Sequence, residues 1–256
     1  LARVMANRLW QHHLGRGIVN TPNDFGLQGE LPTHPQLLDW LATELIEGGW
    51  RLKPLHRKIV LSATYRQSAD YDVAKQKVDP QNKLHWRRTP ARLQAEVIRD
   101  SLLKMSGLLD TRMYGAGTLD ERMKRRSIYF MIKRSKLIPT MQLFDSPEPL
   151  VSQGSRPATI IAPQALHFMN NGQVREAAVA LAVQFEKKTD DNEAINLAYQ
   201  TVVGREPTES ETKSISSFMK AQADSYKAAG RNDARKLALA DLSQVLFGLN
   251  EFIYVN

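Results

Sequence analysis

Apolar residues recur at helical spacing over most of the chain, beginning at its first residue. At about 100° per residue, residues 1–14 place apolar side chains on one side of a helical wheel and polar side chains on the other. The apolar side holds Leu1, Ala2, Val4, Met5, Ala6 and Leu9, and the polar side holds Arg3, Asn7 and Gln11. Gly15 is a typical helix stop. The pattern therefore predicts an amphipathic helix over 1–14.

The next two helices are predicted by start and stop signals as well as by periodicity. Thr33 and Gln36 have the spacing of a capping box around an early proline, and Gly48–Gly49 ends the apolar pattern that follows. A third helix is predicted from about Pro54 to Tyr65. Its inner face includes His56, Val60 and Ala63.

The remaining chain is also mostly helical in pattern. Thr89–Pro90 is expected to open a fourth helix that closes at Gly107, and Ser127–Ile132 is the best strand candidate. Thr208 and Glu211 have the spacing of a second capping box. Further helices are predicted at Pro163–Met169, Gln173–Lys188, Asn192–Val203 and Arg231–Phe247.

Three stretches lack periodicity. Gly15–Leu31 is long enough that we expect an ordered loop with a packing or functional role, and Ser68–Arg88 is expected to be an exposed connection. Pro139–Pro163 holds five prolines and is predicted to be a hinge or wrapping segment.

The predicted fold is mainly α, an irregular multi-helix bundle with long ordered loops and at most a minor β element. Its expected parts are an N-terminal helical half (1–138), a proline-rich connection (139–163) and a C-terminal helical half (164–256). We expect one integrated domain that is part of a larger protein.

Composition narrows the chemistry. The 256 residues include no cysteine, which excludes disulfides, thiolate metal sites and covalent haem attachment within them. The formal net charge is +8, so the surface should attract polyanions. No apolar run approaches the length of a membrane span.

The candidate site residues lie near the N-terminus. Neighbouring histidines diverge by about 100° on a helix, so His12 and His13 are not a metal-binding pair, and we expect neither a metal nor a cofactor. We interpret them, and His56, as core histidines that find polar partners. If an unfamiliar site exists, it should form where these residues converge: Arg8, His12, His13, Arg16, Asp24, His56, Arg57, Tyr65 and Arg66.

The most specific of these hypotheses concerns the loop over 15–31. Asp24 is its only carboxylate before Glu30, and the histidines of the first helix are the nearest polar groups on an apolar face. We therefore predict that Asp24 approaches His12 or His13, with Arg8 or Arg16 sharing the charge.

Other motifs have simpler interpretations. Asp24-Phe25-Gly26 spells the kinase magnesium triplet but lacks its companion motifs, and the standard hydrolase, metalloprotease, nucleotide and dinucleotide signatures are missing. Glu96 and Asp100, flanked by Arg92 and Lys104 at spacing four, predict a ladder of ion pairs on a helix surface.

The densest basic cluster surrounds the predicted strand. It is a candidate polyanion-binding surface, made of Arg125, Arg126, Lys133, Arg134 and Lys136. Interleaved aromatic residues can bind single-stranded nucleic acid, but no nucleic-acid-binding motif accompanies them. We favour a solvated or domain-facing surface.

Several motifs are distinctive in combination. They are ARVMANRLWQHHLGRGIV (2–19), TPNDFG (21–26), HPQLLDWLA (34–42), GWRLKPLHR (49–57), SATYRQS (62–68), DPQNKL (79–84), APQALHFMNN (162–171), GREPTESE (204–211) and NEFIYV (250–255). Together they closely resemble the planctomycete PSD-one domain, a domain of unknown function. Gly172–Gln173 departs from the family, which more usually has proline and an aromatic residue there.

The resemblance implies a setting but no catalytic residues. Domains of this family commonly form the C-terminal part of large exported proteins, often with a c-type cytochrome module upstream. It therefore implies a cell-envelope or secreted location. Upstream domains of the same polypeptide and an anionic polysaccharide are the expected partners. We expect a noncatalytic domain that packs on the upstream module or recognises anionic glycan; the alternative is an oxidoreductase-associated enzyme domain acting on carbohydrate.

Overall fold

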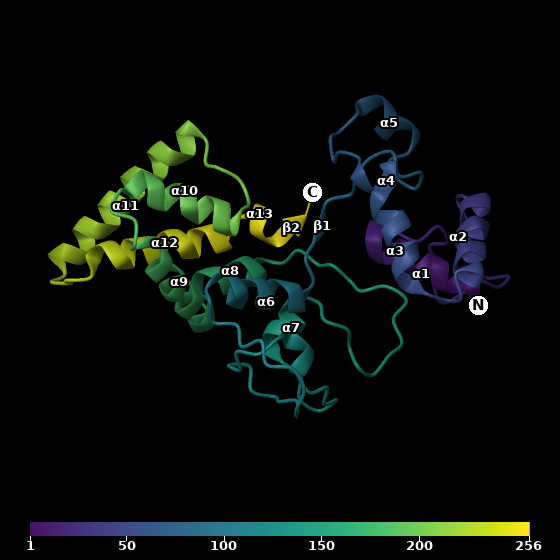
Figure 1. The fold of residues 1–256 in the computed structure, drawn as a ribbon, viewed down its shortest axis with the longest axis horizontal. Coiled ribbons are helices and arrows are strands. Elements are labelled where there is room, and N and C mark those ends of the chain that lie inside the picture. The colour runs from purple at the N-terminus through teal and green to yellow at the C-terminus, as the bar shows by residue number, and fades with distance from the viewer. Residues whose placement is uncertain (256) are drawn as a thin grey trace. The chain divides into compact units, whose positions relative to one another are not determined.

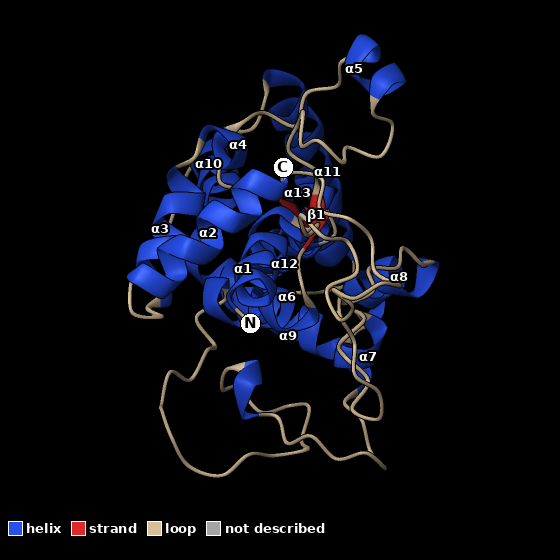
Figure 2. Ribbon diagram, turned by 90° about the vertical axis from the view of Figure 1, so that its right-hand side faces the viewer, coloured by secondary structure: helices blue, strands red, loops and turns tan. Residues whose placement is uncertain are grey.

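The computed structural model describes residues 1–255 and is mainly α, as the sequence predicts. Its described residues contain thirteen α-helices, one 3₁₀ helix and a sheet of two very short strands. Figure 2 shows this dominance of helix. No helix within this range has both the length and the apolar character that crossing a membrane requires.

The chain divides into two compact units, each with its own core. Unit 1 comprises residues 1–91 together with 152–155, and unit 2 comprises 92–151 and 156–255. The predicted connection at 139–163 therefore does not coincide with the division. The physical reason is that Met141, which lies inside the predicted connection, is buried in the same unit 2 core as Ile98.

Unit 1 is built from the N-terminal helices, the purple and blue part of Figure 1. Its helices are α1 (Ala2–Leu14), α2 (Pro35–Glu47), α3 (Leu52–Leu61), α4 (Ala63–Arg66) and α5 (Val73–Val78). The helix α1 packs on α2 and α3, and their buried leucines, isoleucines and Trp10 form the core. Gly15 ends α1 with φ 80°, a conformation that glycine adopts without steric cost.

The loop over 15–31 is ordered, and Asn7 holds it. The Asn7 side chain is fully buried, accepts a hydrogen bond from Val19 N (2.8 Å) and donates one to Val19 O (2.9 Å). A Cβ at Gly17 would lie 2.5 Å from Val19 O, so only glycine fits this crossing. The placement of Asn7 on a polar helix face was therefore wrong: a polar side chain with two backbone partners can be buried.

Two local predictions in unit 1 need correction. No side chain caps α2 at its N-cap residue, His34, and Thr33 instead bonds to Ile18 O and to the His34 ring. The expected exposed connection over 68–88 includes α5 and a buried Asp79, whose carboxylate accepts the N–H groups of Lys83 and Leu84.

Unit 2 begins where β1 (Ala91–Arg92) pairs with β2 (Tyr254–Val255). The fourth predicted helix therefore starts later than Thr89–Pro90, as α6 (Ala95–Met105). The other elements are η1 (Ser127–Tyr129), α7 (Pro139–Leu143), α8 (Ala162–Asn170), α9 (Gly172–Phe185), α10 (Asp191–Val202), α11 (Glu209–Ala228), α12 (Ala234–Phe247) and α13 (Asn250–Ile253).

The helix α12 is the centre of unit 2. It packs on both α9 and α11, and the buried face includes Leu181, Leu239 and Phe247, each with no exposed surface. At the departure from the family pattern, the Asn171 side chain caps α9 by accepting the N–H groups of Gln173 and Val174. Gly172 is therefore compatible with a well-formed helix start.

Candidate functional site

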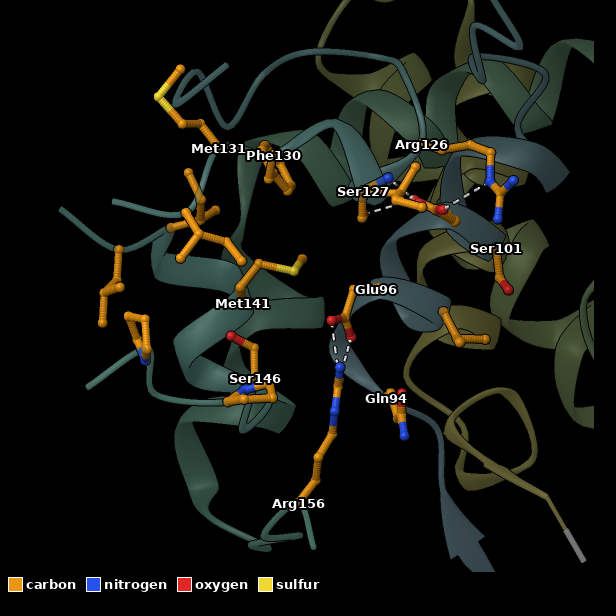
Figure 3. Close-up of a pocket in the computed structure, with 18 of the residues that line it drawn as sticks. Gln94, Glu96, Ser101, Arg126, Ser127, Phe130, Met131, Met141, Ser146 and Arg156 are labelled. Atoms are coloured by element: carbon orange, nitrogen blue, oxygen red, sulfur yellow. Dashed lines mark hydrogen bonds and ion pairs between the residues drawn. The ribbon is translucent and has the colours of Figure 1, made fainter. Parts of the chain in front are cut away.

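Unit 2 contains an open cleft of about 860 Å³. One wall is α6, another is the 126–133 segment with η1, and α7 and the 146–149 segment complete the lining. Figure 3 shows Met141 and Glu96 facing the same open space from α7 and α6. The cleft therefore lies between α6 and a continuous later stretch of chain, residues 126–149.

Most of the lining is apolar. Ile138 and Met141 form a buried part of the wall, whereas Ile128 and Ile132 are 74% and 81% exposed. Three methionines, Met105, Met131 and Met141, also line the cleft. Methionine side chains are flexible and adapt to irregular apolar partners.

The wall at 126–130 is a 3₁₀ turn, so the predicted strand over Ser127–Ile132 is wrong. Asp100 Oδ1 accepts hydrogen bonds from Ser127 N (2.8 Å) and Ser127 Oγ (2.7 Å), which anchors the turn to α6. Buried Arg99 donates to the carbonyls of Met123 and Arg125 and stacks on Phe130. The bond to Asp100 occupies Ser127 N, which a strand would pair with a neighbour, and the segment keeps only an isolated bridge between Phe130 and Thr118.

The predicted ladder of ion pairs along α6 is also wrong. Glu96 binds Arg156 (2.7 Å), Arg92 binds Asp145 (2.6 Å) and Asp100 binds Ser127. Burial is the largest single influence on the pKa of Glu96 and would raise it, but the hydrogen bonds and charge of Arg156 and a backbone hydrogen bond together hold that pKa below its usual value. Both carboxylates of this cleft wall are therefore engaged by partners from distant segments.

The rim of the cleft is positively charged. Lys104, Lys133 and Lys136 line it, and within residues 1–255 none has a carboxylate at salt-bridge distance. Lys133 and Lys136 form the two ends of a tight turn, where Lys136 N donates to Lys133 O (3.0 Å). Glu148 is the acidic residue of the lining that makes no ion pair in the described chain.

The candidate polyanion surface is thus divided by the structure. Arg125 donates to the carbonyls of Arg112, Tyr114 and Ala116, so its guanidinium serves the local fold. Arg126 lies 3.7 Å from Asp100. Lys133, Arg134 and Lys136 remain exposed on the turn at the cleft mouth. The basic groups exposed to a ligand are therefore these three residues and the largely exposed Arg126.

In unit 1, three of the predicted site residues converge. His13 Nε2 lies 2.7 Å from His56 Nδ1, and the Tyr65 ring meets the His13 ring edge to face. The two imidazole centroids are 4.9 Å apart. This separation is close to the sum of the N···N distance and the two ring radii, as expected when the two nitrogens point at each other. The two nitrogens therefore face each other and form one hydrogen bond, in which one ring donates and the other accepts.

A metal ion does not fit this pair. Two ligands need lone pairs that converge on a third point, whereas these lone pairs face one another. Across residues 1–255, no three His, Cys, Asp or Glu side chains gather in a metal-binding group.

The other predicted residues do not join them. His12, Arg57 and Arg66 are exposed, Arg8 donates to Asn23 Oδ1 (3.1 Å), and Arg16 lies 3.9 Å from Glu30. The placement of His12 in the apolar arc of α1 is thereby corrected.

The predicted contact between Asp24 and a histidine is wrong. Asp24 Oδ1 accepts a hydrogen bond from Gly26 N (2.8 Å), and no histidine or arginine of residues 1–255 bonds to it. The short carboxylate satisfies its own turn, so the loop needs no partner on the helix at this position.

Sequence reasoning missed His85, Trp10 and Arg88. The Trp10 indole donates to His85 Nε2 (3.2 Å), and the Arg88 guanidinium stacks on Tyr65. Five of the six histidines lie in residues 1–91, and that concentration was the available signal. The pairing itself spans 75 residues and has no local pattern.

The chain also matches a known protein family. Residues 1–219 match the PSD1 family, described as a protein of unknown function (DUF1553). The chain belongs to the PSD1 family. No curated protein and no solved structure shows a significant match.

The PSD1 match covers both groups of residues described above. The histidines of unit 1 and every residue of the cleft lie before residue 219, whereas the NEFIYV segment lies beyond it. The family brings no assigned catalytic residue, so the chemistry of these sites rests on their geometry.

Proposed function

We propose that this PSD1 domain is a noncatalytic docking module whose unit 2 cleft binds an acidic amphipathic protein segment. The observation that carries the proposal is the apolar cleft with exposed Ile128 and Ile132 beneath a rim of unpaired lysines. Contiguous exposed apolar surface with a polar rim is typical of protein interaction sites. A multidomain, exported setting would supply such a segment in the same polypeptide.

The chemistry of the lining favours a protein over a glycan. Isoleucine and methionine side chains offer non-directional apolar contact, which suits the apolar anchors of a helix lying in a groove. A polysaccharide would need polar partners for its hydroxyl groups, but the cleft carboxylates Glu96 and Asp100 are already bound by Arg156 and Ser127. The free lysines complement acidic side chains on the solvent side of the bound segment.

The same engagement of Glu96 and Asp100 supports a noncatalytic function, and it leaves Glu148 as the acidic residue of the lining without an ion pair in the described chain. General acid–base catalysis needs a group that can exchange a proton with a substrate. Glu96 and Asp100 are tied to cations and to the backbone of the cleft wall.

The test uses one exposed isoleucine in the cleft and one outside it. Ile132 and Ile160 are 81% and 80% exposed, but only Ile132 lines the cleft. A fluorescein-labelled 18-residue peptide, with leucine on one helical face and glutamate on the other, is titrated and followed by anisotropy. Ile132→Glu should weaken binding at least tenfold, about 1.4 kcal/mol, because it places a carboxylate against the peptide's apolar face. Ile160→Glu should leave binding unchanged.

Two outcomes would contradict the proposal. A scrambled peptide of the same composition should bind poorly, and equal binding would show charge attraction without groove recognition. Heparin that binds more tightly than the peptide, and loses affinity on Lys133→Glu but not on Ile132→Glu, would favour glycan recognition.

A further inference from the structure

A second group of polar residues in unit 1 lacks the partner that its chemistry requires. It lies where α1 ends, α2 begins and the 79–85 turn passes. Its members are Arg16, His34 and His85. None of them contributes to the unit 2 cleft.

The protonation of His85 follows from its neighbour. An indole N–H only donates hydrogen bonds, so the contact from Trp10 Nε1 at 3.2 Å requires a lone pair on His85 Nε2. The neutral His85 ring therefore carries its hydrogen on Nδ1. Within residues 1–255 no acceptor is hydrogen-bonded to that N–H. His85 thus offers a free donor at a fixed position.

The Arg16 guanidinium has a carboxylate partner only at long distance. Within residues 1–255, its Nε is buried without a hydrogen-bond partner, and Glu30 is the one carboxylate at salt-bridge distance, 3.9 Å from Nη2. Glu30 also accepts from Asn20 (3.1 Å). Asp79, the other carboxylate nearby, is bound by the backbone N–H groups of Lys83 and Leu84. Four other arginines of the described chain also have a buried Nε without a partner, so what distinguishes Arg16 is the long distance to its carboxylate.

His34 completes the group. Its Nδ1 lies 2.9 Å from Thr33 Oγ1, and its ring centroid lies 6.4 Å from that of His85. Burial lowers the pKa of His85 most, and the proximity of His34 and Arg16 lowers it further. The Arg16 guanidinium and the His85 Nδ1–H are therefore donors in one region, and the His34 ring lies beside His85.

We propose that Arg16, His34 and His85 form a binding site for a small oxyanion: a phosphate, sulfate or carboxylate group. The Arg16 fork and the fixed His85 Nδ1–H supply donors, and charge-assisted hydrogen bonds to such an anion would satisfy the guanidinium. The proposal is independent of the docking function, because it rests on unit 1 alone.

The test measures anion binding at constant ionic strength. Sodium phosphate, sulfate, acetate and a heparin-derived sulfated disaccharide are each titrated against sodium chloride, with side-chain and imidazole shifts followed by NMR. At least one of the oxyanions should cause saturable shifts at Arg16 and His85. Saturation by inorganic anions indicates a free ligand, and saturation by the disaccharide alone indicates a glycan group.

Variants distinguish anion binding at this site from non-specific attraction to the positive charge of the protein. Arg16→Gln should lower the affinity at least tenfold, whereas Arg57→Gln, which removes an exposed arginine of the same unit, should not. If Arg16→Gln disturbs the fold in circular dichroism, His34→Gln serves as the second variant and should weaken binding. Shifts that never exceed those in sodium chloride, or that Arg57→Gln reduces equally, would overturn the site.

Discussion

The contact between His13 and His56 joins α1 to α3 through one hydrogen bond. The neutral pair makes a 2.7 Å bond, whereas two protonated rings would repel each other at the same place. Burial, and then the proximity of His56, His12 and Arg88, lowers the pKa of His13. The ionisable groups that face the pair are cationic or neutral, with no carboxylate bonded to either ring in the described chain.

We therefore expect unit 1 to lose stability in mild acid. A histidine whose folded pKa lies below its unfolded value contributes stability that is present above about 6.5 and is lost as the pH falls through the lower, folded value. Urea unfolding followed by tryptophan fluorescence at pH 8 and pH 5 measures this loss. His56→Gln should reduce the difference between the two pH values, and His12→Gln should reduce it less, because His56 lowers the pKa of His13 more than His12 does. An NMR titration that gives His13 an ordinary or raised pKa would contradict the account.

Among the elements, the two capping boxes predicted from sequence had different outcomes. Thr208 and Glu211 cap α11 reciprocally: Thr208 Oγ1 accepts from Glu211 N (3.3 Å), and Glu211 Oε2 accepts from Thr208 N (2.7 Å). Thr33 has the same spacing to Gln36 but bonds elsewhere. The difference lies in the preceding loop, because Ile18 O offers Thr33 a competing tertiary partner.

The cap of α11 should make stability depend on pH in a defined window. Hydrogen bonds from Arg205 and then from Thr208 lower the pKa of Glu211 from 4.5 to about 2. Stability from this group is therefore present above about 4.5 and is lost as the pH falls through 2. Glu211→Gln should flatten the stability curve of unit 2 across this window, as measured by circular dichroism and urea.

Glu209→Gln is the matched control, since Glu209 lies in the same first turn and makes no ion pair in the described chain. It should leave the slope between pH 4.5 and pH 2 unchanged. Equal flattening in both variants would show that the helix dipole, rather than the cap and Arg205, determines the effect.

At the scale of the molecule, two separate cores are the main feature. The unit 1 core is made by residues from Ala6 to Ile59, including Ile18 and Val19 of the 15–31 loop, and the unit 2 core by residues from Ala95 to Ile253. All four tryptophans, Trp10, Trp40, Trp50 and Trp86, lie in unit 1. Tryptophan fluorescence therefore reports on unit 1, while most of the helical signal comes from unit 2.

We predict that the two cores unfold in distinguishable transitions. Leu41→Ala in unit 1 and Leu181→Ala in unit 2 each truncate a side chain with at most 1% exposure, which typically costs about 2–5 kcal/mol. Leu41→Ala should shift the fluorescence midpoint, and Leu181→Ala should shift the midpoint from circular dichroism. Coincident transitions that both variants shift equally would show a single cooperative unit.

The sequence by itself determined the helical class, the stop at Gly15 and the cap at Thr208, because these depend on contacts within a few residues. It also identified His13, His56 and Tyr65 as candidates, but it assigned Asp24 the wrong partner. The tertiary structure decided that Asn7 is buried, that Arg125 serves the local fold and that Arg16 lacks a matched acceptor. Each of these outcomes depends on which polar groups, far apart in sequence, meet in the folded chain. The local periodicity of the sequence does not show which of them become hydrogen-bond partners.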